Sequence, residues 1–188
     1  MRKIQLQTAL IALVLMLIWW QAGLWYQSQL ISDERAEVAD HLASRGNSLA
    51  TSISSRLDKL DGLHAFVQAE MGSSPGLLGR RFATFASNVY SEDSGIINMA
   101  VAPEGVFQFV YPEEAERSMI GQSLFRDLSP AFRADIKRAI DTGGLVITPP
   151  HEMKRGGWGI VARRAVLDNG SFWGIVSMTM DARKVLQS

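Results

Sequence analysis

The strongest constraint on the fold of this chain is a pair of apolar runs, residues 158–167 and 172–180, separated by Asp168-Asn169-Gly170-Ser171. Asn-Gly between two strand-like runs is typical of a tight β-hairpin, because both residues tolerate a positive φ. The second run alternates as a half-buried strand requires. Its expected buried face carries Phe172, Val176, Met178 and Met180, and its other face carries Ser177 and Thr179. The C-terminal part is therefore predicted to form an antiparallel hairpin.

An uncharged stretch near the N-terminus, Ile4 to Tyr26, predicts a transmembrane helix, since about 20 apolar residues cross the hydrocarbon core. A cleaved signal peptide is the alternative, but no clear small-residue cleavage site follows the stretch. Basic residues precede the stretch and acidic residues follow it, so the positive-inside rule places the N-terminus in the cytoplasm. These flanking residues are Arg2 and Lys3 before the stretch, and Asp33, Glu34 and Glu37 after it. The rest of the chain is then expected outside the cytoplasm.

From Ser32 onward, mixed charge with apolar residues every three or four positions predicts a long stalk helix. A heptad frame fits, with one core position at Ala39, Gly46, Ile53, Leu60 and Val67, and the other at Leu42, Leu49, Arg56 and Leu63. Gly46 and Arg56 weaken this frame. The helix is interpreted either as a homodimer seam or as an amphipathic element packed on its own domain, and the two roles can coexist along its length.

The remaining residues predict an α+β domain with a five-stranded antiparallel sheet. Two strand-like runs, 96–102 and 106–111, are joined by Ala102-Pro103-Glu104-Gly105, which suits a type I turn. Helices are expected over 77–90 and after Ser129-Pro130, and a short strand over 145–148 precedes the C-terminal hairpin. Such an order of elements is the layout of PAS-like sensor domains. The expected organisation is a cytoplasmic tip and transmembrane helix at 1–26, a stalk helix at 27–76 and a sensor domain at 77–188.

A series of short motifs between Leu77 and Leu186 resembles the CHASE domain. The motifs are Asn98 to Val106, Val110-Tyr111-Pro112, Ile120-Gly121, Ala139 to Gly143, Val146 to Pro150, Gly156 to Gly159 and Phe172-Trp173-Gly174. CHASE domains are extracytoplasmic sensors of histidine kinases, diguanylate cyclases and related transmembrane receptors. The resemblance implies a periplasmic, PAS-like ligand-binding module at a bacterial inner membrane, usually dimeric and held between two membrane spans. Neither a second span nor an output domain follows Ser188, so the sequence is interpreted as a fragment or a truncated product.

Composition and motifs exclude several other classes of function. The chain has no cysteine, so thiolate catalysis and cysteine-based zinc sites are excluded. Its 19 basic and 19 acidic residues balance, which gives no basic face for a nucleic acid. The three histidines have no ligand spacing, and no nucleotide-binding or nucleophile motif occurs. We expect neither an enzyme nor a bound metal or cofactor.

The candidate ligand-binding residues are Asn98, Phe109, Tyr111, Thr148, Met153, Lys154 and Trp158. Asn98 interrupts an apolar strand, so its amide must find a partner, which is either a ligand or the backbone of the core. Phe107, Phe109 and Tyr111 are expected on one aromatic face, as pocket lining or as ordinary core. The residues from Thr148 to Trp158 are included because, by resemblance, they border the loop that PAS-like modules fold over a pocket.

Arg163 and Arg164 are adjacent in a predicted strand and therefore point to opposite faces. One of them should be solvated, while the other requires an acid or the carboxylate of a ligand. Two functions are compatible with all these features. The first is the ligand-sensing region of a transmembrane receptor that recognises a small molecule. The alternative is a membrane-tethered periplasmic interaction module without a small-molecule ligand.

Overall fold

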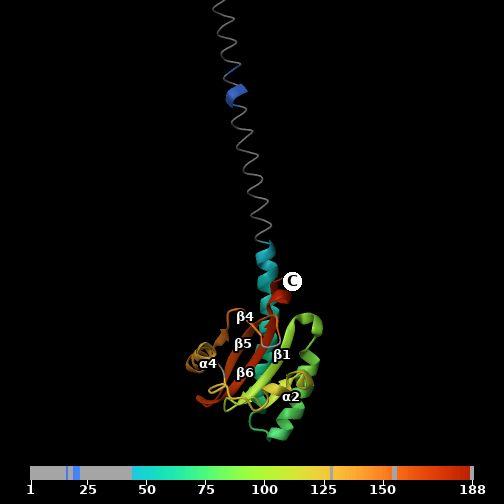
Figure 1. Ribbon diagram of the computed structural model, residues 1–188, viewed down its shortest axis with the longest axis vertical. Coiled ribbons are helices and arrows are strands. Elements are labelled where there is room, and N and C mark those ends of the chain that lie inside the picture. Colours follow the sequence, from blue (N-terminus) through green and yellow to red (C-terminus); the bar gives the residue numbers. More distant parts are fainter. Residues whose placement is uncertain (1–15, 17–18, 22–43, 128, 154–155, 187–188) are drawn as a thin grey trace, which may run out of the picture. The chain divides into compact units, whose positions relative to one another are not determined.

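The computed structural model describes residues 16, 19–21, 44–127, 129–153 and 156–186. The chain divides into two compact units, Met1–Asn47 and Ser48–Ser188, and the fold below is that of the second (Figure 1). Most of the expected transmembrane stretch, Ile4 to Tyr26, lies outside the described residues. None of the helices in the described part combines the length and apolar character that crossing a membrane requires.

The second unit is built on an antiparallel sheet of six strands in the order β2-β1-β6-β5-β3, with β4 also paired to β5. The strands are β1 (Ile96–Pro103), β2 (Phe109–Tyr111), β3 (Leu145–Ile147), β4 (His151–Glu152), β5 (Trp158–Asp168) and β6 (Ser171–Asp181). The α+β class is confirmed, but the expected number of five strands is wrong. The additional strand, β4, is only two residues long and follows Pro149-Pro150, so no alternating pattern marks it.

The predicted C-terminal hairpin is confirmed as β5 and β6. Asn169 and Gly170 have φ values of 48° and 82°, as the Asn-Gly signal requires. The register shifts between Val166 and Leu167, where β6 has one extra residue. For this reason Phe172 does not share a face with Val176, Met178 and Met180 as the alternation predicted, and it packs on the opposite side of the sheet.

The second predicted hairpin, β1 and β2, is also present, but its details differ from the prediction. Regular pairing starts only at Phe109, opposite Val101, while Val106 forms an isolated bridge with Ser123. The backbone before β2 therefore does not alternate, and Phe107 packs on the opposite side from Phe109 and Tyr111. The connecting turn is not type I, because Glu104 has a φ of 53°.

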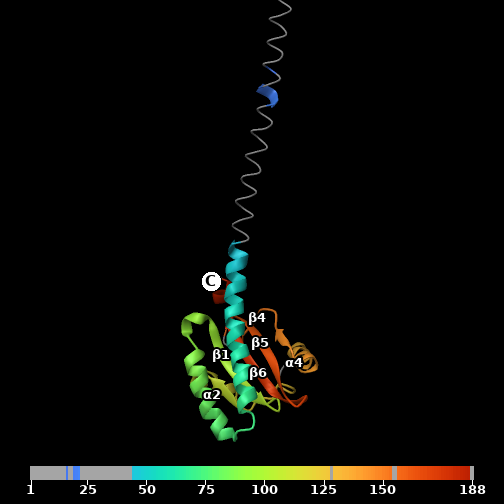
Figure 2. The ribbon, with the colours of Figure 1, turned by 180° about the vertical axis from the view of Figure 1, so that it is seen from behind.

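Helices cover both faces of the sheet. Residues 44–70 are helical, and the part at 48–70, called the long helix below, belongs to the second unit. The long helix and α2 (Pro75–Val89) cover one face, where Leu60, Leu63 and Phe82 join the core (Figure 2). We call this the long-helix face.

The opposite face, called the α4 face, packs against α4 (Pro130–Thr142), whose Ile136 is fully buried with Ala165 and Ile175. The Ser129 hydroxyl caps α4 by accepting from the Phe132 N–H, and Gly143 ends it with a φ of 62°. The shorter elements are α3 (Glu113–Glu116), α5 (Ala182–Leu186) and two 3-10 turns at Glu92–Ser94 and Arg117–Met119.

The long helix is an integral part of the hydrophobic core of the second unit. Leu60, Leu63 and Val67, all assigned to the heptad frame, have no exposed surface. Arg56 is buried as well, and its Nε donates to the Ser94 carbonyl oxygen at 2.6 Å. These observations favour an amphipathic helix packed on its own domain over this length. Ala39 and Leu42, the first heptad positions, lie outside the described residues.

Candidate ligand-binding site

Three adjacent strands bring polar side chains together on the α4 face. Arg163 of β5 pairs with Ser177 of β6, which pairs with Ala100 of β1, so all three point to the same side. Asn98, two residues before Ala100, also lies on this side. Arg163, Ser177 and Asn98 are exposed by only 5%, 3% and 4%. A sheet face that is otherwise apolar therefore contains a compact polar set.

Arg163 is the charged member of this set. Its guanidinium carbon lies 5.2 Å from the centre of the Phe132 ring on α4, in cation-π geometry. Its Nε and Nη1 atoms are buried and find no hydrogen-bond partner among the described residues. Burial lowers the pKa of Arg163 to about 10, and the negative charge of Asp135 partly opposes this shift. Arg163 is thus a cation at neutral pH with unused donors.

Asn98 contributes an unused acceptor. Its Nδ2 donates to the Met119 sulfur at 3.8 Å, a weak interaction. Its buried Oδ1 has no partner within the part of the chain that the structure describes. Buried amide oxygens are almost always hydrogen-bonded in folded proteins. The α4 face therefore contains a donor group and an acceptor group that both lack a protein partner among the described residues.

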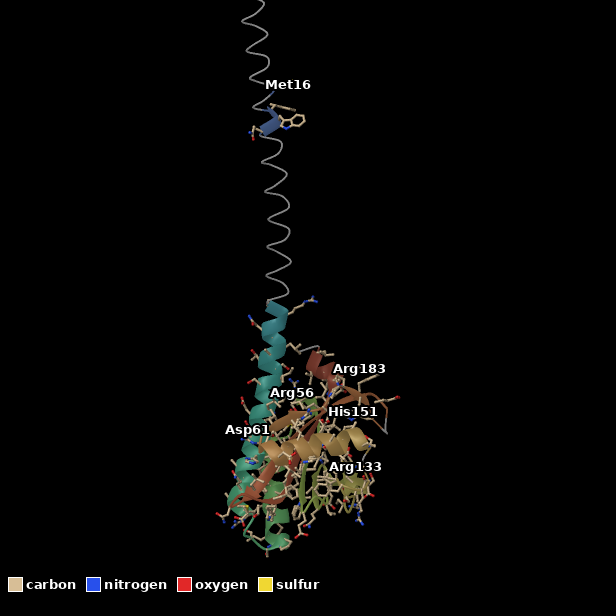
Figure 3. The ribbon with its side chains drawn as sticks, turned by 90° about the vertical axis from the view of Figure 1, so that its left-hand side faces the viewer. Met16, Arg56, Asp61, Arg133, His151 and Arg183 are labelled. Atoms are coloured by element: carbon tan, nitrogen blue, oxygen red, sulfur yellow. The ribbon has the colours of Figure 1, made fainter. Side chains whose placement is uncertain are left out.

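Aromatic side chains border the polar set on the α4 side. The Phe132 ring, which contacts Arg163, also meets the His151 ring edge-on at 4.8 Å. His151 begins β4, so the β4–β5 hairpin lies against α4 at this point. Figure 3 shows α4 in front of the sheet, with His151 near it, and Arg56 and Asp61 on the long helix.

The predicted site residues do not all converge. Asn98 belongs to the polar set, whereas Phe109 and Tyr111 pack toward the long-helix face. The Thr148 hydroxyl accepts from the Val161 N–H at 3.0 Å, so it is satisfied within the sheet. The Met153 side chain lies close to Gly159 of β5, and Trp158, at the start of β5, is 50% exposed. Lys154 lies outside the described residues.

Phe109 and Tyr111 line a separate cleft of about 550 Å³ between α2, β2 and α3. The walls of this cleft are aromatic at Phe82 and Phe109, and its rim carries Glu113, Glu114 and Arg117. These polar groups are on its exposed edge, in contrast to the buried polar set of the α4 face. Nowhere in the described part of the chain do three potential metal-ligating side chains come together.

Sequence reasoning identified Arg163 only as one of two candidates for an unpaired charge. The structure resolves the pair, because Arg164 points to the long-helix face and its Nη1 bonds Asp61 at 2.6 Å. Phe132 and His151 were not predicted as site residues. Phe132 follows the helical periodicity of α4, so its sequence pattern is that of an ordinary core residue.

Several solved structures share this fold. The ligand-binding domain of the Pseudomonas aeruginosa amino acid chemoreceptor PctC, in complex with GABA, aligns over 75% of this chain and 60% of its own, with a TM-score of 0.55 and 14% identity. That of the Pseudomonas fluorescens chemoreceptor CtaA, in complex with L-serine, aligns over 80% and 62%, with a TM-score of 0.55 and 13% identity. The sensor domain of the V. cholerae histidine kinase DctB aligns over 79% and 57%, with a TM-score of 0.52 and 14% identity.

The chain therefore shares the PAS-like fold of these ligand-binding and sensor domains. It spans about 60% of the length of the chemoreceptor domain that carries GABA. No protein-family model matches the sequence. No curated protein matches it either.

Proposed function

We propose that this chain is the extracytoplasmic ligand-sensing region of a bacterial transmembrane signalling receptor, of the CHASE type. The observation that carries the proposal is the polar set of the α4 face, where Asn98 Oδ1 and two Arg163 nitrogens are buried without a partner among the described residues. Such groups are costly unless something binds them. The PAS-like fold supports the same conclusion, since two proteins that share it were solved with GABA and L-serine bound.

The C-terminal end offers a route by which a signal leaves the domain. The Asp181 N–H, at the end of β6, donates to the Gly95 carbonyl oxygen at 2.8 Å. Gly95 also lies against Lys184 of α5 and close to the Arg56 guanidinium of the long helix. The last strand and the long helix therefore meet around one residue. Kinase or cyclase output would belong to a further portion of the receptor, and the sensing region itself is proposed to be non-catalytic.

A thermal-shift screen of the 188-residue chain in detergent tests the proposal. A ligand that binds only the folded state raises its stability, by about 2.7 kcal/mol at a hundredfold excess over the dissociation constant. We expect at least one small organic metabolite to raise the melting temperature. Asn98→Leu should lose this response while its circular dichroism stays native, and Trp158→Ala tests the predicted rim in the same way.

Asn88→Leu is the matched control, because Asn88 is exposed on α2, on the other side of the sheet. It should respond as the wild type does. A broad library that produces no shift in the wild type would contradict the proposal and favour the interaction module without a small ligand. A normal response in folded Asn98→Leu would place the ligand elsewhere, with the cleft beside β2 as the next position to test.

A further inference from the structure

The charge of Arg163 carries an inference about the chemical class of the ligand. We propose, building on the ligand-sensing function above, that the ligand carries a carboxylate group and that Arg163 binds this group on the α4 face of the sheet. The described acid whose charge acts on Arg163 is already paired with another residue. Asp135 influences it electrostatically, but the Asp135 carboxylate accepts from Arg138 Nη2 at 2.6 Å. The guanidinium thus remains without a hydrogen-bonded counter-ion in the described structure.

A buried cation without an anion is unfavourable, and a carboxylate is the group that corrects this most directly. Arginine presents planar N–H donors that match the geometry of carboxylate oxygens, and such charge-assisted bonds are about twice as strong as neutral ones. A neutral carbonyl or hydroxyl would satisfy the donors but leave the charge uncompensated. Phe132 adds to the selectivity, because its ring covers one side of the guanidinium and leaves the N–H edges for the ligand.

Asn98 indicates what the rest of the ligand carries. Its free Oδ1 accepts hydrogen bonds only, so it requires an N–H or O–H donor from the ligand. Asn98 is on β1 and Arg163 on β5, with β6 between them and an offset of two residues along the strands, so their backbones lie about 12 Å apart. The long Arg163 side chain shortens this gap. A small organic acid with a hydroxyl or amino group near its carboxylate fits the two positions, with Leu124 and Ile136 as apolar neighbours.

The test uses the same chain in detergent and a panel of small hydroxy and amino acids, each paired with the amide that replaces its carboxylate. Neutral and cationic metabolites complete the panel. We expect shifts of the melting temperature with acids and not with their amides. In Arg163→Met the response should disappear, with affinity at least about 30-fold weaker, as expected when one partner of a buried charge pair is removed.

Arg163→Met should fold, because it replaces a buried unpaired charge by an apolar side chain of similar length, and its melting temperature without ligand should equal or exceed that of the wild type. Arg163→Lys, which keeps the charge but loses the planar donors, provides a second variant and should bind with intermediate affinity. Arg80→Met, at an exposed position of α2, should respond as the wild type does.

The outcomes separate this inference from the receptor function. Shifts with neutral or cationic compounds alone would overturn the carboxylate class and leave the sensing function intact. Equal responses to acids and amides, or an unchanged acid response in folded Arg163→Met, would also overturn it. If no compound shifts the wild type, both proposals fail.

Discussion

At the scale of single residues, β5 alternates between two environments over three consecutive positions. Arg163 faces α4, Arg164 bonds Asp61 of the long helix, and the Ala165 carbonyl oxygen accepts from His64 Nε2 at 3.0 Å. The carbonyl can only accept, so Nε2 carries the proton in this bond. The strand β5 is thereby joined to α4 on one face and to the long helix on the other.

The environment of His64 predicts a pH dependence of stability. Burial lowers the pKa of His64, the bond to Ala165 opposes this shift, and nearby Arg164 adds to it. Below about pH 6.5, His64 takes up a proton more readily in the unfolded chain than in the folded chain. The free energy of unfolding should therefore decrease as the pH decreases. In His64→Gln this part of the decrease should be absent. Urea denaturation between about pH 7 and 5 gives the free energy of unfolding of the wild type and of His64→Gln at each pH. An equal decrease in the two proteins would contradict the prediction.

At the scale of secondary-structure elements, patterns within one segment predicted the structure better than relationships between segments. The Asn169-Gly170 turn and the cap at Ser129 were read correctly because their causes lie within a few residues. The shift beside Val166, which moves Phe172 to the other face, has no such local signal. It depends on how β5 and β6 pair, and a one-residue slip reverses every side chain beyond it.

The candidate site was only partly predictable for a related reason. Asn98 could be singled out because a polar residue in an apolar strand is visible in the sequence. The sequence does not show which of the two arginines, Arg163 or Arg164, lacks an acidic partner. That depends on a contact between β5 and Asp61, which lies more than a hundred residues earlier in the chain. The same limit applies to the long helix, whose heptad positions fit a dimer seam and an intramolecular core equally well until its partners are known.

The role of the long helix as core gives a prediction for this element. Leu63→Ala should reduce the free energy of unfolding by about 2–5 kcal/mol, because Leu63 is fully buried against the sheet and a cavity remains. Ser55→Ala, at an exposed position of the same helix, should change it by less than about 0.5 kcal/mol. Urea titrations give both values. Similar small effects at the two positions would show that the helix is dispensable for the core.

At the scale of the whole molecule, the proposed arrangement is an anchor at the inner membrane and a sensing domain in the periplasm. A homodimer through the stalk is proposed as well. Leu60, Leu63 and Val67 are occupied within the domain, so the stalk positions left for a partner copy are the earlier ones. Ala39 and Leu42 are the first of these in the heptad frame.

The orientation can be measured directly. Arg2 and Lys3 precede the apolar stretch and acidic residues follow it, so alkaline phosphatase fused after Ser188 should be active. Green fluorescent protein fused at the same position should be dark, which controls for the level of expression. A bright fluorescent fusion together with an inactive phosphatase fusion would reverse the proposed topology.

The bonds that β5 makes to the long helix have a thermodynamic consequence for a receptor of this design. If binding at Arg163 changes the strength of the Asp61 and His64 contacts, those contacts must change the affinity for the ligand by the same factor. Reciprocity of this kind means that, in the proposed receptor, whatever holds the long helix also acts on the site. Fixing the long helix in one position would then change the affinity of the site for its ligand. A receptor with a fixed helix would respond over a different range of ligand concentration from a receptor with a free helix.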